Sequence, residues 1–353
     1  MMKNYLISTG GSGGHVIPAV ILCEHLAKEA KVFISSDKRG VKYLEKNYNC
    51  EIINTPRLNS IILFPLNLII LLILTIKSFF LLKNKKIEKL FSTGGYMSLP
   101  LIVAARLLNL KIYLIEPNHV LGRANKFFLN SCKKIFCYTK RIKNFPLKYK
   151  KKIEVIYPLV REKIYKTNSI LPKDDKFTIL VVGGSQGASI FDKDLQKKIV
   201  NISKKFPLRI IQQTKEKNIS NLEDFYIKND IENSIFFFDK NFEKILIKSD
   251  LCITRAGASA LAELSVLNIP FIAVPLPSSK DNHQYENANF YKDKGCCWIL
   301  DQKLFEENIE ELIINIIQNK NDYLNKIENL KKLNFQNNWI NVNQKILNIV
   351  NEN

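Results

Sequence analysis

Short apolar runs alternate with longer stretches of mixed polarity along most of the chain. The apolar runs of the first half are NYLIST, KVFISS, KLFSTGG, KIYLIE and KKIFCY. The pattern restarts in the second half with FTILVVGGSQGA, LRIIQQT, IFFFD, DLCITRAGA and PFIAVPLP. Buried strands that alternate with helices predict parallel sheets covered by helices on both faces. We therefore expect an α/β fold built from two similar halves.

A polar stretch, LPKDDK at 171–176, separates the two halves. We expect a first domain over 1–160 and a second domain over 161–335. The remaining residues, 336–353, are predicted to form a C-terminal helix that packs back on the first domain. Ligands of such sheets bind in the loops at the carboxyl ends of the strands. Two domains that face each other would place these loops on either side of one cleft.

Four glycine-rich turns follow predicted strands. They are TGGSGGH (9–15), STGGYMSLP (92–100), GGSQGA (183–188) and RAGASALAE (255–263). Glycine lets a ligand approach the backbone closely, and the N-terminus of a following helix favours an anion such as a diphosphate. None of the turns has the G-x-G-x-x-G or the Walker A spacing, which disfavours a nicotinamide or flavin cofactor. We predict no cofactor, and dependence on a divalent metal stays open.

Positive charge is concentrated in the first half. Of the net charge of +20, residues 1–158 carry +18 (26 Lys and Arg against 8 Asp and Glu) and residues 159–353 carry +2. A basic surface of this kind can bind nucleic acid or an anionic bilayer. The seven cysteines include no CxxC pair, so we expect reduced thiols in the core and no metal site. The first residues have no signal-peptide pattern, and we expect no secretory signal.

Six motifs resemble, in order, those of one family of bacterial glycosyltransferases. They are GGSGGHVIPA, STGGYMSLP, EPNHVLGRANK, GGSQGA, TRAGASALAEL and DNHQYENA, which together span 10–288. That family transfers N-acetylglucosamine from UDP-N-acetylglucosamine to undecaprenyl-diphosphate-N-acetylmuramoyl-pentapeptide, which gives lipid II for peptidoglycan synthesis at the cytoplasmic face of the membrane. The resemblance implies a GT-B fold, in which two Rossmann-like domains face each other across a cleft. It also implies an inverting transfer to the C4 hydroxyl of the acceptor.

Matched residue by residue, the resemblance implies a set of donor contacts. Glu263 is similar to the carboxylate that accepts both ribose hydroxyls, and Ser185 is similar to the residue that binds the diphosphate. Gln284 and Asn118 resemble amides at the donor sugar, and Arg161 resembles an arginine that closes the interdomain linker onto the donor. The other donor-side positions are Phe238 and Asp239, which match the uracil cap, and the loop residues Ser12, Gly13, Gly14, Ala258 and Ser259.

His15 is the candidate general base. It lies at the expected N-terminus of the first helix, where the helix dipole disfavours imidazolium. The reaction needs a base that takes the proton of the acceptor hydroxyl. Capping of the loop, or binding of the acceptor diphosphate, is the alternative role. The other acceptor-side positions that the resemblance implies are Gly94, Gly95, Tyr96 and His119.

Two positions depart from the family pattern. Pro117 stands where the family usually has Gln, and the proline of YPLVR is shifted relative to Arg161. These two loops therefore need not keep the family geometry.

Other interpretations of the sequence stay open at this point. GGSQG also fits the G-x-S-x-G nucleophile elbow of α/β-hydrolases, with Ser185, Asp250 and His283 as a triad. A nucleic-acid-binding module would suit the basic first half, although no helix-turn-helix, zinc-finger or RNP-like motif supports it. Asp192 and Asp194 form a DxD pair, which we interpret as exposed helix charges rather than as a metal site.

The most apolar segment is 61–82, in which 17 of 22 residues are apolar. Its length permits a membrane span, but its polar interruptions and the strands on both sides favour a crossover helix. On a helical wheel, the face expected against the sheet holds Ile69, Leu72, Ile73, Ile76 and Phe80. The outward face is expected to hold Leu74 and Leu81, followed by Lys83, Lys85 and Lys86. This outward face predicts reversible binding to an anionic membrane, and burial under a loop or a dimer partner is the alternative.

Overall fold

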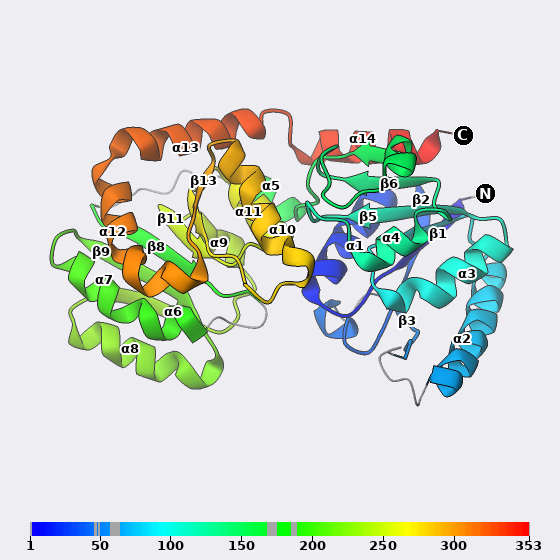
Figure 1. Ribbon diagram of the computed structural model, residues 1–353, viewed down its shortest axis with the longest axis horizontal. Helices are drawn as coiled ribbons and strands as arrows, with labels where there is room; N and C mark the ends of the chain where they lie inside the picture. The colour runs from blue at the N-terminus through cyan, green and yellow to red at the C-terminus, as the bar shows by residue number, and fades with distance from the viewer. Residues whose placement is uncertain are drawn as a thin grey trace. The chain divides into compact units, whose positions relative to one another are not determined.

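The chain divides into two compact units, each built on one parallel sheet (Figure 1). The structure is a computed structural model that describes residues 2–45, 48, 50–56, 64–167, 175–184 and 189–352. Unit 1 comprises Met1–Leu159 and Trp339–Asn353, and unit 2 comprises Val160–Asn338. The predicted α/β class is confirmed.

Unit 1 contains a seven-stranded sheet of order β3-β2-β1-β4-β5-β6-β7, in which all neighbouring strands are parallel. Its central strands are almost continuously buried, as expected where helices cover both faces of a parallel sheet. The strands are β1 Lys3–Ser8, β2 Ala30–Ser36, β3 Cys50–Ile52, β4 Lys89–Ser92, β5 Lys111–Glu116, β6 Lys134–Cys137 and β7 Ile153–Val155. The helices are α1 Gly13–Leu26, α2 Phe64–Asn84, α3 Leu99–Leu107, α4 Arg123–Phe128 and α14 Trp339–Asn351, with short 3₁₀ turns at Val41–Tyr43, Tyr96–Ser98 and Leu147–Lys152.

Unit 2 contains a six-stranded parallel sheet of order β10-β9-β8-β11-β12-β13. The strands are β8 Phe177–Val182, β9 Leu208–Gln213, β10 Glu232–Phe236, β11 Leu251–Thr254, β12 Phe271–Ala273 and β13 Cys297–Ile299. The helices are α5 Glu162–Lys166, α6 Ser189–Asp194, α7 Gln196–Ser203, α8 Ile219–Lys228, α9 Phe242–Leu246, α10 Ala258–Val266, α11 His283–Asp293, α12 Phe305–Gln318 and α13 Lys320–Leu333, with 3₁₀ turns at Glu216–Asn218, Lys280–Asn282 and Gln302–Leu304.

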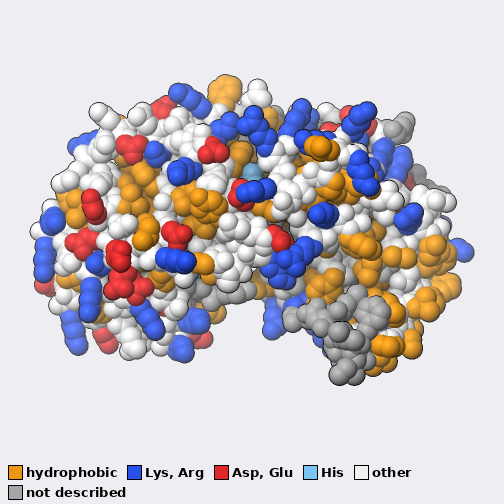
Figure 2. All heavy atoms as spheres, viewed as in Figure 1, with side chains coloured by type: hydrophobic (Ala, Val, Ile, Leu, Met, Phe, Trp, Pro, Cys, Tyr) orange, Lys and Arg blue, Asp and Glu red, His pale blue; other side chains and the backbone are white. Residues whose placement is uncertain are grey.

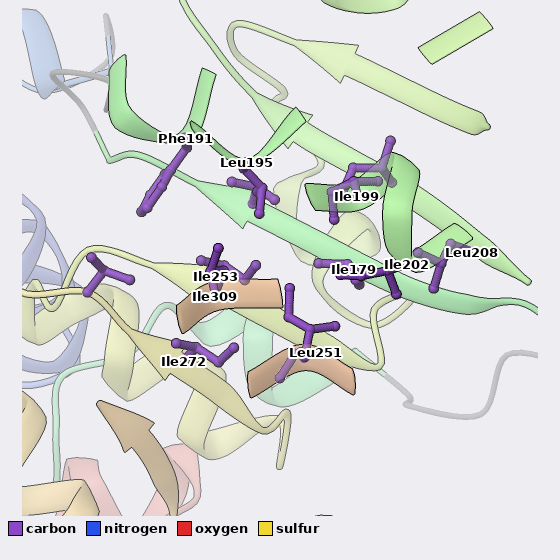
Figure 3. Close-up of a cluster of buried hydrophobic side chains, with 14 of the residues drawn as sticks. Ile179, Phe191, Leu195, Ile199, Ile202, Leu208, Leu251, Ile253, Ile272 and Ile309 are labelled. Atoms are coloured by element: carbon purple, nitrogen blue, oxygen red, sulfur yellow. The ribbon is translucent and has the colours of Figure 1, made fainter. Parts of the chain in front are cut away.

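One face of this second sheet carries a core of buried hydrophobic side chains. Ile179, Ile253 and Ile272 project from three neighbouring strands toward Phe191 of α6 and Ile309 of α12 (Figure 3). Burial of such side chains contributes roughly 1.5–3 kcal/mol each. This packing fixes the strands whose ends carry the glycine-rich turns.

The strand order of each sheet reverses at one point. In unit 1 the reversal lies between β1 and β4, and in unit 2 it lies between β8 and β11. In open α/β sheets, ligands bind outside the carboxyl ends of the strands at this switch point. The four glycine-rich turns follow these four strands, so each unit carries two of them at its own switch point.

The C-terminal helix α14 belongs to unit 1, although it follows unit 2 in the sequence (Figure 1). It packs on α1, where the Trp339 ring stacks on the His25 ring at 3.8 Å between centroids. Asn343 Nδ2 donates to the His25 carbonyl oxygen at 3.0 Å. His25 is fully buried, and this burial, with the charge of Lys28, lowers its pKa to about 3.

Acid is expected to destabilise unit 1 through His25. An unfolded histidine titrates near pH 6.5, whereas folded His25 stays neutral down to about pH 3. The contribution of neutral His25 to the free energy of unfolding is therefore complete above pH 6.5 and is lost as the pH falls toward 3. At pH 5 the free energy of unfolding is expected to be lower by about 2 kcal/mol. The measurement is urea unfolding at pH 7 and pH 5, followed by Trp339 fluorescence in a Trp298→Phe background. In His25→Phe, which keeps an aromatic stack, we expect a correspondingly smaller pH dependence; equal losses in both proteins would rule out His25 as the cause.

The helix α2 connects β3 to β4, as expected of a crossover helix, but its orientation is the reverse of the predicted one. The side chains predicted to face the sheet are 50–62% exposed, and they are Ile69, Leu72, Ile73, Ile76 and Phe80. Leu74 and Leu81, predicted to face outward, pack instead against the core of unit 1. Figure 2 shows the outward side chains as an orange area along α2 at the lower right.

The buried stripe of α2 explains the reversal. Asn67, Leu71, Ser78 and Leu82 are buried and lie four or seven residues apart, and the helix packs on α3. This stripe contains two polar residues, so hydrophobicity along the sequence does not mark it. A helix that is apolar all round has no periodic signal that orients it.

Among the described residues, α2 is the one helix that is long and apolar enough, over Pro65–Asn84, to cross a membrane by length and composition. Two features of the fold argue against a span. The strands on both sides of α2 belong to one sheet, and Leu71 and Leu82 are buried in unit 1.

Candidate active site

The turn after β1 places His15 in the first turn of α1. Ser12 is the N-cap in an extended conformation, and the helix begins at Gly13. Gly10 has φ +151°, and a Cβ there would lie 2.7 Å from Asp37 Oδ1, so only glycine fits this turn. Gly14 is exposed beside the half-buried His15.

The His15 ring is oriented by the neighbouring turn. Its Nδ1 lies 2.8 Å from the carbonyl oxygen of Thr93, at the end of β4. A carbonyl oxygen can only accept a hydrogen bond, so Nδ1 carries the proton. In the neutral ring Nε2 is then the acceptor, which is the form a general base needs.

A buried carboxylate at the end of β2 connects the two glycine-rich turns of unit 1. Asp37 Oδ1 accepts from the amides of Gly11 and Gly40, each at 2.8 Å. Its Oδ2 accepts from Arg39 Nε at 2.9 Å, and Arg39 Nη2 donates to the Tyr96 hydroxyl at 2.8 Å. Burial would raise the pKa of Asp37, but these hydrogen bonds outweigh it and hold the pKa below its usual value. A small cavity of about 240 Å³ beside them is lined by Asp37, Lys38, Arg39, Asn54, Thr55 and Tyr96.

The turn after β4 lies next to His15 through Thr93. Gly94 and Gly95 have φ values of +88° and +85°, which L-residues rarely adopt. The turn therefore depends on glycine, and it places the half-buried Tyr96 beside Arg39.

The turn after β5 is organised by Glu116. Its Oε1 accepts from the Asn118 side chain at 3.1 Å, and its Oε2 accepts from Gly122 N at 2.8 Å and Asn125 Nδ2 at 3.0 Å. The amide of Asn118 is thereby fixed despite the preceding proline. His119, expected on the acceptor side, is only 7% exposed.

In unit 2, Glu263 lies on α10, whose N-terminus follows β11. Gly257 is the N-cap, and Ala258 and Ser259 form the first turn, where free amides and the helix dipole favour an anion. Glu263 is 7% exposed. Both of its oxygens accept from Arg161, from Nε and Nη2 at 2.7 Å each.

The helix α5, which begins just after Arg161, also contacts the segment that follows β10. Lys163 Nζ pairs with Glu243 Oε2 at 2.7 Å and donates to the Lys240 carbonyl at 2.8 Å. Burial would raise the pKa of Glu243, but Lys163 and the nearby charge of Arg161 outweigh it and lower the pKa.

Two further segments of unit 2 carry residues that were predicted to contact the donor. Phe238 is 72% exposed, and Asp239 Oδ1 accepts from Asn241 N at 2.6 Å. Gln284, on α11, accepts from Leu276 N at 2.9 Å, so its amide nitrogen is the end left to meet a ligand. Ser185, predicted to bind the diphosphate, lies outside the described residues; the described part of its turn ends at Gly184, which has φ +77°.

The DxD interpretation requires a correction. Asp192 is not an exposed charge but accepts hydrogen bonds from Gln212, Thr214 and Asn218 at 2.8–3.0 Å. It ties α6 to β9 and the turn that follows. No group of acidic, histidine or cysteine side chains among the described residues has the arrangement of a metal site.

The hydrolase triad is not assembled. Asp250 Oδ2 accepts from Thr178 N, at the beginning of β8, whereas GGSQGA follows the other end of that strand. His283 Nδ1 lies 2.8 Å from the Lys280 carbonyl oxygen, not against Asp250. An acid that cannot orient the histidine leaves the triad without its third member.

Two residues of this site were missed in the sequence. Asp37 and Glu116 each lie at or just after the carboxyl end of a predicted strand, in KVFISSD and KIYLIE. An acidic residue at that place is the available signal, because side chains there reach the neighbouring turns.

Both units match domains of one known family. Residues 5–137 match the glycosyltransferase family 28 N-terminal domain, and residues 178–340 match its C-terminal domain. The UDP-N-acetylglucosamine–N-acetylmuramyl-(pentapeptide) pyrophosphoryl-undecaprenol N-acetylglucosamine transferase of Pelagibacter ubique (strain HTCC1062) is 48% identical over 100% of both chains. The enzyme of the same name from Rickettsia felis is 36% identical over 94% of this chain and 95% of its own.

The crystal structure of Acinetobacter baumannii MurG has the same fold, with a TM-score of 0.78 and 23% identity over 99% of each chain. The expected fold of GT-B type is therefore confirmed. Because both family domains match in order and a relative is 48% identical along the whole chain, the protein belongs to glycosyltransferase family 28.

Proposed function

We propose that the chain transfers N-acetylglucosamine from UDP-N-acetylglucosamine to the C4 hydroxyl of diphosphoryl-undecaprenol-linked N-acetylmuramoyl-pentapeptide, giving lipid II. The observation that carries this proposal is the chemistry at the two switch points. Unit 1 presents a histidine with a fixed tautomer between two glycine-rich turns. Unit 2 presents a helix N-terminus with a carboxylate on the same helix. The curated relatives that match the full chain are named for this reaction.

In this proposal unit 2 holds the donor. The diphosphate lies at the N-terminus of α10, and Ser185 is expected to bind it. Glu263 accepts the ribose hydroxyls, and the exposed Phe238 ring covers uracil. Gln284 contacts the sugar through its amide nitrogen.

Unit 1 holds the acceptor and performs the proton transfer. The acceptor C4 oxygen attacks the anomeric carbon of N-acetylglucosamine, and the bond from that carbon to the diphosphate oxygen breaks with its electrons leaving on UDP. The hydroxyl proton passes to His15 Nε2. A single displacement of this kind inverts the anomeric configuration. Gly94, Gly95 and Tyr96 border the acceptor on the other side of His15.

We also propose that unit 1 binds an anionic membrane reversibly, at the cytoplasmic face of the inner membrane. The outer α2 face, defined as Leu66, Ile69, Leu72, Ile73, Ile76 and Phe80, replaces the face predicted from the wheel. Exposed Lys77, Lys83 and Lys86 lie on or next to this helix. Lys85 is not available for this role, because it pairs with Glu51 at 3.1 Å. An apolar face with lysines beside it suits a lipid surface, which is where an undecaprenol-linked acceptor is anchored.

The donor site is tested by Glu263→Ala. Removal of the carboxylate is expected to weaken UDP binding by roughly 1.5–3 kcal/mol, the range for hydrogen bonds to a charged group. The measurement is isothermal titration with UDP, with circular dichroism as the folding control. Glu232→Ala is the matched control, because Glu232 also pairs with an arginine, Arg209, but at the opposite end of the sheet. Unchanged UDP affinity in a folded Glu263→Ala protein would remove Glu263 from the site.

A further inference from the structure

The carboxylate proposed to bind ribose is already occupied by the protein itself. Arg161 donates to both oxygens of Glu263 in a bidentate arrangement, and the Glu263 side chain is only 9% exposed. Bidentate arginine–carboxylate pairs are among the strongest charged hydrogen bonds in proteins. Each oxygen keeps a second lone pair, but the Glu263 side chain is so buried that two ribose hydroxyls have little room to reach it while the guanidinium stays in place. A nucleoside therefore has to compete with the guanidinium.

The surroundings allow Arg161 to move while its helix stays in place. Lys163, two residues later, holds α5 to Glu243 and to the backbone at Lys240. The Arg161 side chain is 31% exposed, so a rotamer change can carry the guanidinium away from Glu263. From Glu263 to Ala258 the helix rises by about 7.5 Å. An arginine beside α10 can therefore exchange the carboxylate for an anion at the helix N-terminus.

We propose that Arg161 makes recognition of the nucleoside conditional on its diphosphate. In the empty site Arg161 holds Glu263. A nucleoside diphosphate offers the guanidinium a second oxyanion, and Glu263 is then released to the ribose hydroxyls. A nucleoside without phosphates offers no replacement partner, so it has to break the ion pair without compensation. Arg161 thus has two roles. It binds the diphosphate, and it is a specificity residue that rejects uridine. This inference rests on the proposed donor site in unit 2.

The test compares uridine and UDP in the whole protein. Dissociation constants are measured by isothermal titration, with displacement titrations for the weak ligand, in wild type and in Arg161→Met. Methionine keeps much of the apolar stem but cannot pair with Glu263 or with a phosphate. We expect uridine to bind about 10-fold more tightly and UDP about 10-fold more weakly, from the loss of a charged hydrogen bond in each case. The preference for UDP over uridine then falls by about 100-fold.

Arg161→Lys separates the two roles. Lysine lacks the planar fork that matches a carboxylate but keeps a charge for a phosphate. Uridine affinity is therefore expected to rise while UDP affinity stays within a few-fold of wild type. In the double variant Arg161→Met/Glu263→Gln, the gain for uridine is expected to disappear. Arg209→Met, at the Arg209–Glu232 pair, is the control and should change neither ligand.

The decisive result is that Arg161→Met changes the two affinities in opposite directions, with tighter binding of uridine and weaker binding of UDP. Weaker or unchanged uridine binding in both folded Arg161 variants would overturn the proposal, because the guanidinium would then not block Glu263. Unchanged UDP binding in Arg161→Met would overturn it as well, because no exchange onto the diphosphate would take place. Failure of wild type to bind UDP, or an unaffected Glu263→Ala, would instead refute the donor site itself.

Discussion

Replacement of His15 by alanine is expected to lower kcat by about 10²–10⁴, the usual contribution of a general base. The hydrogen bond from Nδ1 to Thr93 leaves Nε2 as the proton acceptor, and alanine provides none. His15→Gln should lose a similar factor, because its amide can still donate to Thr93 but takes no proton. UDP affinity should change little in both variants, because His15 is proposed to act on the acceptor hydroxyl and not to contact UDP. Initial rates at saturating donor and acceptor measure the effect.

Two results would contradict this role. A loss confined to the acceptor KM would make His15 an acceptor-binding residue rather than the base. A covalent glycosyl–enzyme intermediate, detected by mass spectrometry, would exclude the single displacement. Folding of both variants is checked by circular dichroism, since α1 also carries the buried contacts of His25.

Removal of the outer α2 face is expected to release the protein from anionic liposomes. The variant replaces Leu72, Ile73, Ile76 and Phe80 by serine. Partial insertion of each of these side chains into the lipid is expected to contribute about 1 kcal/mol to the free energy of binding. Loss of all four should therefore weaken membrane binding by about 10³-fold. Glutamine at Lys83 and Lys86 should weaken binding further, by about 1 kcal/mol per charge, and salt should act in the same direction. Co-sedimentation with vesicles of mixed anionic and neutral lipids measures the effect.

The controls for this experiment come from the orientation of α2. Leu74→Ser and Leu81→Ser are expected to lower the free energy of unfolding rather than to release the protein, because both side chains pack on the core. Serine at Leu324 and Phe335, which are exposed in unit 2, should leave liposome binding unchanged. Undiminished binding of the four-serine variant would place the membrane contact elsewhere, and resistance of wild type to carbonate extraction would mean that α2 is integral.

Most strands were predictable because they are buried on both faces. β1, β4, β5, β8 and β11 appear in the sequence as continuous apolar runs. The strands that were not predicted are β3, β7 and β13, each three residues long and at the edge of its sheet. Strand β10 is also an edge strand. It was predicted at IFFFD, but it begins earlier, at Glu232, and ends at Phe236. Edge strands bury little surface and leave little periodic signal.

The glycine-rich turns were predictable for a local reason, whereas the partners of the charged residues were not. A turn with positive φ must be glycine wherever the rest of the chain lies. The ion pair Arg161–Glu263 joins residues that lie 102 positions apart in the sequence. The hydrogen bond from Gly11 to Asp37 joins residues that lie 26 positions apart. Only the strand order, with its two reversals, brings such residues together. The orientation of α2 likewise depends on the packing of its neighbours and not on its own sequence.

The place of α14 has a consequence for how the chain is made. Ribosomes deliver unit 2, residues 160–338, before Trp339–Asn351 exists, so the domain that begins first in the sequence is completed last. Until then His25 has no stacking partner, and Lys89 Nζ lacks its bond to the Val350 carbonyl oxygen. Domains usually fold in the order of their synthesis. Here His15, the proposed base, lies on α1, whose packing partner α14 is synthesised only after unit 2, so the packing of α1 cannot be completed before α14 has been made.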